Sequence, residues 1–205
     1  MKKLPSQIPI FPLSGVIYFP KTNLPLNIFE QRYLNLVNDT MKKDKLMGMI
    51  QEKKEGNSLY NIGCLGKISD FQKSDDGRIL INLTGLTRFE ILEEKKNTKL
   101  YREFSVDYTK FSLDLEPVLE EIDIFSLIQK TEIFFNKNGL LLNWKEFEKL
   151  GNLQKINTLS MIAPITNEEK QKLLESISLT EKINSLKEII EFYLHQAFSD
   201  SRTIQ

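Results

Sequence analysis

Apolar and polar residues alternate differently in the two halves of this chain, and the first half has the pattern of β structure. Two short apolar runs, 8–13 and 16–19, flank Ser14-Gly15, and prolines interrupt them at positions 9, 12, 20 and 25. Because an interior proline removes a backbone donor and clashes with the preceding turn, this stretch cannot be one long helix. The pattern predicts two short strands and a turn, followed by the entry to a helix.

A helix is predicted over residues 28–42. Asn27 followed by Glu30 fits a capping box, in which the cap side chain accepts a backbone hydrogen bond and the carboxylate returns to the cap. Five apolar residues then recur at helical spacing, namely Phe29, Tyr33, Leu36, Val37 and Met41. The sequence therefore predicts one apolar helix face that begins at Phe29.

Further strands are predicted at residues 46–51, 60–72 and 78–93, and β character continues over 101–111. Asp75-Asp76-Gly77 joins two of them, and Asp-Gly is a strong hairpin signal because it adopts positive φ angles at low cost. In the strand after this turn the apolar residues share one parity, and the polar residues, Arg88 among them, share the other. This alternation is typical of an antiparallel strand with one wet face. Gly85 interrupts it and indicates a bulge or a barrel corner.

From about residue 115 the apolar residues recur at spacings of three and four, which predicts helices. Pro117 suits the first turn of a helix that includes Val118 and Phe125, and Asn138-Gly139 suits its end. Two later helix starts carry capping boxes, Thr166 with Glu169 and Ser178 with Glu181. The chain is therefore predicted to comprise a β-rich part, residues 1–112, and a helical part, residues 116–198.

Composition narrows the classes of function. Lys and Arg number 28, Asp and Glu also number 28, and the formal net charge is zero, which argues against a broad polyanion-binding surface. Cys64 is the single cysteine, so it forms neither an intrachain disulfide nor a cysteine-based zinc site, and a lone thiol suits a reducing cytoplasm. No apolar run approaches the ~20 residues that a membrane span needs. We therefore expect a cytoplasmic protein with no metal, no cofactor and no membrane partner.

No catalytic motif is present in the sequence. GxxxxGK[ST], GxSxG, HExxH and GxGxxG are all absent, and the only histidine, His195, is expected at the surface of the last helix. Gly63-Cys64-Leu65-Gly66 has the spacing of an RNA-binding KH loop. It begins a predicted strand, however, so we expect the two glycines to allow a tight strand crossing and Cys64 to be a core residue. The sequence predicts no catalytic residue.

Aromatic residues gather around a predicted connection between two helices of the second half. They are Phe134, Phe135, Trp144 and Phe147. Aromatic side chains at such a place could line a peptide-binding groove, or they could form the core of the helical bundle, and the spacing does not decide between the two. These four residues are the only candidate binding residues that the sequence supplies.

Three groups of short motifs follow one another along the chain. They are Ile10-Phe11-Pro12-Leu13, Phe19-Pro20, Leu24-Pro25-Leu26 and the run from Ile28 to Tyr33; then Ile62-Gly63, Ile68, Asp76-Gly77 and the run from Gly85 to Phe89; and finally the run from Lys170 to Glu175. In order and spacing, over about residues 7–195, these motifs resemble the Lon amino-terminal domain, the substrate-binding domain of ATP-dependent Lon proteases.

The resemblance implies an α+β fold, in which a PUA-like antiparallel β barrel with one helix precedes a C-terminal helical bundle, and the two parts form one Lon amino-terminal domain. It also implies a non-enzymatic module that binds proteins or peptides, such as an adaptor in protein quality control. Its partners would be unfolded or specific protein segments, together with a protease or a chaperone. The ATPase and Ser–Lys peptidase modules of full Lon proteases are not in this sequence, so we expect the free-standing relatives to be the better match.

The alternative function is a small-ligand or RNA-binding module that uses the barrel. The balanced charge makes nucleic acid the weaker of these two ligands, because phosphate contacts need local cations. One long-range ion pair is also hypothesised, between Arg88 and Glu30. Cys64 stands where relatives often have threonine, and Lys182 stands where arginine is common, so no specific polar contact is carried over to those two positions.

Overall fold

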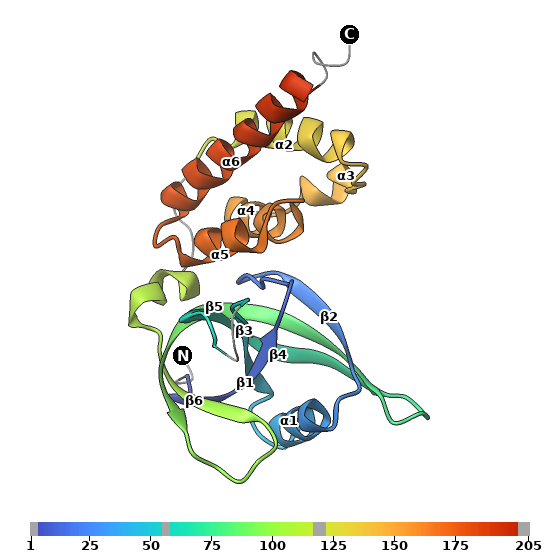
Figure 1. Ribbon diagram of the computed structural model, residues 1–205, viewed down its shortest axis with the longest axis vertical. Coiled ribbons are helices and arrows are strands. Elements are labelled where there is room, and N and C mark those ends of the chain that lie inside the picture. Colours follow the sequence, from blue (N-terminus) through green and yellow to red (C-terminus); the bar gives the residue numbers. More distant parts are fainter. Residues whose placement is uncertain (1–3, 55–57, 117–121, 201–205) are drawn as a thin grey trace. The chain divides into compact units, whose positions relative to one another are not determined.

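The computed structural model describes residues 4–54, 58–116 and 122–200, with side chains described as far as Gln196. By its internal contacts the chain divides into two compact units, Met1–Pro117 and Val118–Gln205. The first unit holds the strands and α1 (Gln31–Met41), and the second holds the later helices (Figure 1).

The strands of the first unit are β1 (Gln7–Leu13), β2 (Asn23–Ile28), β3 (Leu46–Gln51), β4 (Ile62–Lys73), β5 (Ile79–Lys95) and β6 (Arg102–Asp107). Within the described residues they form one sheet in the order β2-β5-β4-β3-β1-β6, and a further pairing between β5 and β6 closes it into a barrel. Figure 1 shows the strands curving round to this closure. The long strand β5 serves two neighbours on one edge, because its first half pairs with β2 and its second half with β6.

One pairing differs from the antiparallel barrel that the resemblance implies. β1 and β3 run parallel, with Ile10 opposite Gly48 and Pro12 opposite Ile50, whereas the other strand pairs of the described chain are antiparallel. A parallel pair needs a long crossover connection, and the segment that contains β2 and α1 supplies it. The sheet is therefore mixed, and the α+β class with C-terminal helices is confirmed.

The second strand and the first helix begin later than the sequence predicts. Residues 16–19 form no strand, and α1 begins at Gln31 after the cap residue Glu30, whose side chain makes no capping hydrogen bond. Asn27 and Ile28, which were expected at the helix start, belong to β2 and pair with β5. The long-range ladder overrides the local capping signature, so the predicted cap at Asn27 is wrong.

The hairpin and the bulge lie where the sequence predicts them. Gly77 has a φ of +87° in the turn between β4 and β5. The register between these strands shifts beside Gly85, where an added Cβ atom would lie 2.3 Å from the carbonyl oxygen of Phe19. Cys64 is buried in β4, as predicted. The barrel core includes the buried residues Ile8, Ile10, Ile50, Leu59, Leu65, Phe89, Phe104 and Val106.

Arg88 lies inside the barrel unit and not on a wet face. Its Nε and Nη2 atoms donate to the carboxylate of Asp114 at 2.9 and 2.8 Å, and the two side chains are only 5% and 7% exposed. Asp114 belongs to the 3-10 helix η1 (Thr109–Leu115), so this ion pair fastens η1 to β5. Glu30 pairs with Arg32 at 2.9 Å instead. The hypothesised pair between Arg88 and Glu30 is therefore wrong.

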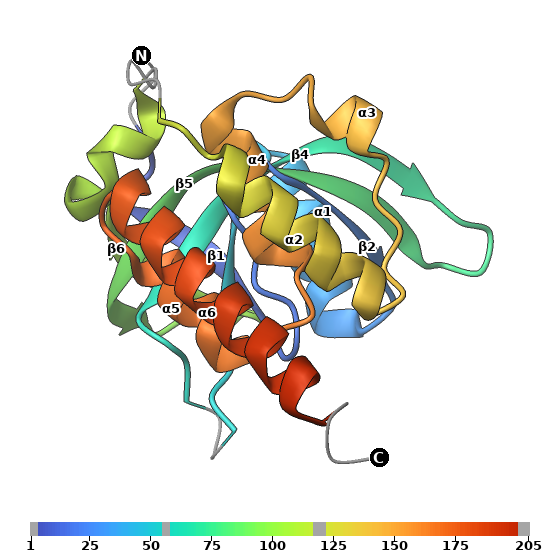
Figure 2. The same cartoon turned by 90° about the horizontal axis from the view of Figure 1, so that it is seen from above.

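The helices of the second unit are α2 (Phe125–Lys137), α3 (Trp144–Phe147), α4 (Asn152–Ile162), α5 (Asn167–Glu175) and α6 (Leu179–Asp200). α2 and α6 run side by side, as Figure 2 shows and the contacts between them agree. The first of these helices begins at Phe125 and ends before Gly139, whose φ is +67°. Its end is as predicted and its start is later than predicted, while Pro117 and Val118 lie outside the described residues.

The ends of the last two helices follow local signals. Thr166 and Glu169 form the complete capping box at the start of α5, as predicted. Ser178 accepts a hydrogen bond from the backbone N–H of Glu181 at 3.0 Å, but the Glu181 carboxylate accepts from Ile177 and not from the cap. None of the helices in the described part of the chain combines the length and the apolar character that a membrane crossing requires.

Candidate functional site

A groove of about 300 Å³ lies in the first unit, where the ends of β1 and β2 approach the start of α1. Its apolar lining includes Phe11 and Pro12 from β1, Leu26 and Ile28 from β2, and Phe29 from the short link to α1. Both strands end here, so the residues that line the groove are only partly covered by the barrel core.

Phe29 is the most unusual side chain of this groove, because it is 67% exposed while its neighbour Ile28 is 2% exposed. It follows the last residue of β2 and precedes the helix cap, so neither element turns its ring toward the core. The floor of the groove is apolar and includes the rings of Phe11 and Tyr33, which stack with centroids 4.0 Å apart. The sequence prediction that placed Phe29 on the buried face of a helix is wrong.

The rim of the groove carries more negative than positive charge. Glu30 and Arg32 pair with each other at 2.9 Å. The carboxylate of Glu52 accepts a hydrogen bond from the Ser14 hydroxyl at 2.9 Å, and no cation among the described residues pairs with it. Arg102 interacts with this carboxylate electrostatically without a direct ion pair, so a positively charged ligand group can still pair with Glu52 at the groove.

The alternation of Leu24, Leu26 and Ile28 is the signal that could have located this site. It has the period of two that is typical of a strand, and the observed burial follows it, since Leu24 and Ile28 are buried and Leu26 is half-buried. A strand that ends at Ile28 leaves Phe29 outside both the ladder and the helix, which is where the structure places it.

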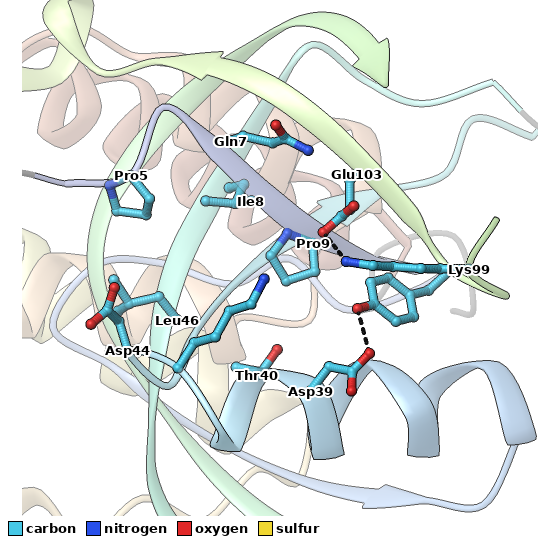
Figure 3. Close-up of a pocket in the computed structure, with 12 residues that line it drawn as sticks. Pro5, Gln7, Ile8, Pro9, Asp39, Thr40, Asp44, Leu46, Lys99 and Glu103 are labelled. Atoms are coloured by element: carbon cyan, nitrogen blue, oxygen red, sulfur yellow. Dashed lines mark hydrogen bonds and ion pairs between the residues drawn. The ribbon is translucent and has the colours of Figure 1, made fainter. Parts of the chain in front are cut away.

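A second pocket, of about 290 Å³, lies in the same unit between the start of β1 and the end of α1 (Figure 3). Gln7 and Pro9 of β1 lie across from Asp39 and Thr40 of α1, and the Thr40 oxygen points away from the helix toward the strand. This pocket is more polar than the groove, since amide, hydroxyl, carboxylate and ammonium groups all line it.

The charged groups of the second pocket are largely paired with one another. The Tyr101 hydroxyl donates to Asp39 at 2.9 Å, and this hydrogen bond is the main cause that holds the pKa of Asp39 below its usual value. Lys99 pairs with Glu103 at 2.8 Å. The Thr40 hydroxyl is buried and has no hydrogen-bond partner in the described part of the chain. Among the described residues that line this pocket, Thr40 has the buried side-chain oxygen that a polar atom of a ligand could bond to.

The aromatic residues that the sequence singled out lie together in the second unit. Trp144 contacts both Phe135 and Phe147, with ring centroids 6.1 and 5.4 Å away, and Phe134 lies 6.4 Å from Phe135. The three phenylalanines are 1–4% exposed and Trp144 is half-buried. Their burial favours the core interpretation, because a buried ring offers little surface to a peptide.

The GxxG motif and His195 show no sign of a catalytic or ligand-binding role in the described part of the chain. Gly63 and Gly66 lie inside β4, where an added Cβ atom would come within 2.5 Å of the Met49 carbonyl oxygen and of the Leu83 side chain, respectively. His195 is exposed near the end of α6. In residues 4–54, 58–116 and 122–200, no three side chains of His, Cys, Asp or Glu gather closely enough to hold a metal ion. The lack of space for a side chain at Gly63 and Gly66 agrees with the tight strand crossing that the sequence predicts.

A closed mixed barrel, followed along the chain by a unit of helices, places the chain in the α+β class. Comparison with known proteins gives the family. Residues 7–191 match the family described as the ATP-dependent protease La (LON) substrate-binding domain. The chain belongs to this family, as the resemblance in the sequence implied.

Curated relatives of the chain include Lon proteases. The chain is 26% identical over 208 aligned positions to the Lon protease of Syntrophus aciditrophicus, covering 94% of this chain and 26% of that protein. It is 25% identical to the Lon protease of Heliobacterium modesticaldum, covering 90% of this chain and 24% of that protein. The chain thus spans about a quarter of the length of these relatives.

Solved structures agree on the fold. The crystal structure of a Lon N-terminal domain protein from Xanthomonas campestris superposes with a TM-score of 0.65 at 18% identity, covering 89% of this chain and 97% of that one. The N-terminal domain of a Mycobacterium avium complex Lon protease gives a TM-score of 0.64 at 15% identity, covering 90% of this chain and 98% of that one. At these identities the likeness establishes the shared architecture.

Proposed function

We propose that this chain is a non-enzymatic recognition module that binds exposed segments of other proteins in the groove between β2 and α1. The observation that carries the proposal is Phe29, an aromatic side chain that is 67% exposed beside an apolar floor. Family membership supports the same function, because the family is one of substrate-binding domains. Buried aromatic anchors contribute much of the binding free energy in protein interfaces, and Phe29 is available to become one.

The finer form of the proposal is an adaptor in protein quality control, which holds an unfolded or specific segment and has a protease or a chaperone as its second partner. Its non-enzymatic part is supported by the match of residues 7–191 to a substrate-binding domain. A cytoplasmic location belongs to the same proposal, and the single buried thiol of Cys64, which suits a reducing compartment, supports it.

Replacing Phe29 by serine is expected to weaken binding to a permanently unfolded protein by about 10-fold, the size of a typical aromatic anchor. The probe is fluorescently labelled, reduced and carboxymethylated lactalbumin, and the measurement is fluorescence anisotropy at increasing concentrations of the chain. Phe29 is already exposed, so its loss should leave the free energy of unfolding nearly unchanged.

The matched control is Leu92→Ser, because Leu92 is 66% exposed in the same unit but does not line the groove. This variant should bind the probe as tightly as the unsubstituted chain. Equal weakening by the two substitutions would show that apolar surface in general, and not the groove, attracts the probe. No binding by the unsubstituted chain would contradict the proposed function itself.

A small-ligand function is the second candidate, and the buried, unpartnered Thr40 hydroxyl beside the second pocket favours it. A ligand with a polar atom near Thr40 would remove the cost of leaving this hydroxyl without a hydrogen bond. The RNA-binding alternative stays a prediction from the sequence, and a gel shift with structured RNA over a range of salt concentrations tests it.

The effect of Thr40→Val on stability should differ between protein with an empty second pocket and protein with a ligand bound there. In the ligand-free chain, the substitution should raise the free energy of unfolding by about 1 kcal/mol, because it removes a buried hydroxyl without a partner and keeps the volume of the side chain. Urea unfolding of protein that was purified under denaturing conditions and refolded provides the measurement. A loss of stability on substitution would mean that the hydroxyl has a partner, and a loss only in natively purified protein would identify that partner as a bound ligand.

A further inference from the structure

Strand β2 has one open edge. It pairs with β5 over its whole length, from Asn23 opposite Thr84 to Ile28 opposite Ile79, and with no other strand of the described residues. An open edge presents backbone N–H and C=O groups that another extended chain can pair with. The groove with Phe29 lies at the end of this same strand.

The hydrogen bonds of β5 establish which residues of β2 face outward. The N–H of Gly85 donates to the carbonyl of Thr22 at 2.9 Å, and backbone bonding to one neighbour alternates along an antiparallel strand. Leu24 and every second residue after it therefore bond to β5. Asn23, Pro25 and Asn27 direct their backbone groups away from the sheet.

The position of the proline agrees with this assignment. Pro25 has no N–H, and a proline in a sheet is tolerated where its missing donor faces away from the ladder. Its carbonyl remains available, as do both backbone groups of Asn23 and Asn27. In the described part of the chain no hydrogen bond reaches these outward backbone groups, and all three residues are exposed.

We propose that a bound protein segment adds to β2 as a further strand, with an apolar side chain against Phe29 and a basic side chain beside Glu52. This inference rests on the proposed function and specifies its mode of recognition. Strand addition reads mainly the backbone of the ligand, while pockets beside the edge select side chains. Such recognition suits unfolded segments, because every polypeptide carries the same backbone groups.

The charge of the groove supports a basic residue in the segment. Glu30 is paired with Arg32, whereas Glu52 accepts a hydrogen bond from the Ser14 hydroxyl. Arg102 interacts with the Glu52 carboxylate electrostatically, but no cation of the described residues forms a direct ion pair with it. A lysine or arginine of the ligand could form that ion pair. The segment is therefore an extended peptide in which a large apolar residue and a basic residue lie close together in sequence.

The test uses one peptide and its two N-methylated forms. The probe is a fluorescent, acetylated and amidated peptide of sequence Val-Thr-Phe-Thr-Lys-Thr-Val, and each modified form carries N-methyl groups on alternate residues, in one form on the odd positions and in the other on the even ones. Only one of these two sets of N–H groups faces β2 in an added strand. Strand addition therefore predicts that one form binds at least about 10-fold more weakly and that the other binds nearly as tightly as the unmodified peptide.

The outcomes distinguish this inference from the proposed function. If the unmodified peptide binds and both methylated forms bind equally well, strand addition is overturned and binding of protein segments stands. If the unmodified peptide does not bind, strand addition is also overturned, while binding of unfolded lactalbumin decides the proposed function separately.

The basic residue has its own test. Glu52→Gln should weaken binding of the lysine-containing peptide by about 3-fold, which is the size expected for an ion pair at the rim of an interface. The same substitution should leave unchanged the affinity for a peptide with threonine in place of the lysine. Equal effects on the two peptides would contradict the assigned role of Glu52.

Discussion

Replacing Asp114 by alanine is expected to lower the free energy of unfolding by about 3–5 kcal/mol, the cost of leaving a buried charge without its partner. Asp114 accepts from the Arg88 guanidinium through both carboxylate oxygens and also from the Arg88 backbone N–H at 2.9 Å. The guanidinium lies 4.2 Å from the ring centroid of Phe111, so water does not readily replace the lost carboxylate. Urea unfolding followed by circular dichroism in the β region measures the loss.

The matched control is Glu94→Ala. Arg102 donates to Glu94 through the same two atoms, Nε and Nη2, at 2.7 and 2.6 Å, but these side chains are 34% and 46% exposed. Solvent screening should keep the cost of this substitution below about 1 kcal/mol. A double variant, Arg88→Met with Asp114→Leu, should be more stable than Asp114→Ala, because it leaves no unpaired charge. Similar losses for Asp114→Ala and Glu94→Ala would show that burial of the first pair does not determine its contribution.

Replacing Phe135 by alanine is expected to cost about 3–5 kcal/mol in the second unit, as for other large aromatic residues that are removed from a core. Its ring is 1% exposed and contacts Trp144. Trp144 is the single tryptophan of the chain, so its fluorescence follows the unfolding of the helical unit selectively. Urea unfolding monitored in this way gives the change in midpoint.

Leu141→Ala is the control for this substitution, because Leu141 is 98% exposed and its loss should leave the midpoint unchanged. The same two variants decide between the alternatives that the sequence left open for the aromatic cluster. If Phe135→Ala kept its stability and instead lost affinity for unfolded lactalbumin, the cluster would be a binding surface and the core interpretation would be wrong.

The parts of the fold that follow from short-range interactions could be predicted from the sequence. Asp76-Gly77 requires a positive φ angle and specifies the β4–β5 hairpin without reference to distant residues. The side chains of Thr166 and Glu169 each accept a hydrogen bond from the other residue's backbone N–H. This capping box spans only four residues and defines the start of α5. Between such turn and capping signals, the spacing of the apolar residues indicates whether a segment is a helix or a strand.

The parts that depend on distant partners could not be predicted in this way. Asn27 and Glu30 have the pattern of a helix start, but pairing with β5 extends β2 through Asn27, and the sequence alone does not reveal that partner. Arg88 has the parity of a solvent-facing residue in its strand, yet Asp114, 26 residues later in the chain, allows it to be buried as an ion pair.

The candidate site was missed for the same reason. Phe29 is exposed because it stands between a strand and a helix, and an error of three residues in the helix start moved it onto a predicted buried face. The aromatic residues around the predicted connection between two helices are identified by residue type and position in the sequence, and neither distinguishes an anchor in a groove from a member of the core.

Site-specific photo-crosslinking tests whether protein segments bind at the groove beside Phe29. A photoreactive benzoylphenylalanine is placed at position 29 in one preparation and at position 141 in another, and each is irradiated with unfolded lactalbumin. Both sites are exposed, but only the first lines the groove. Binding at the groove predicts a covalent adduct from position 29 that an excess of unlabelled probe suppresses, and little adduct from position 141. Equal adducts from the two positions, or an adduct from position 141 alone, would contradict binding at the groove.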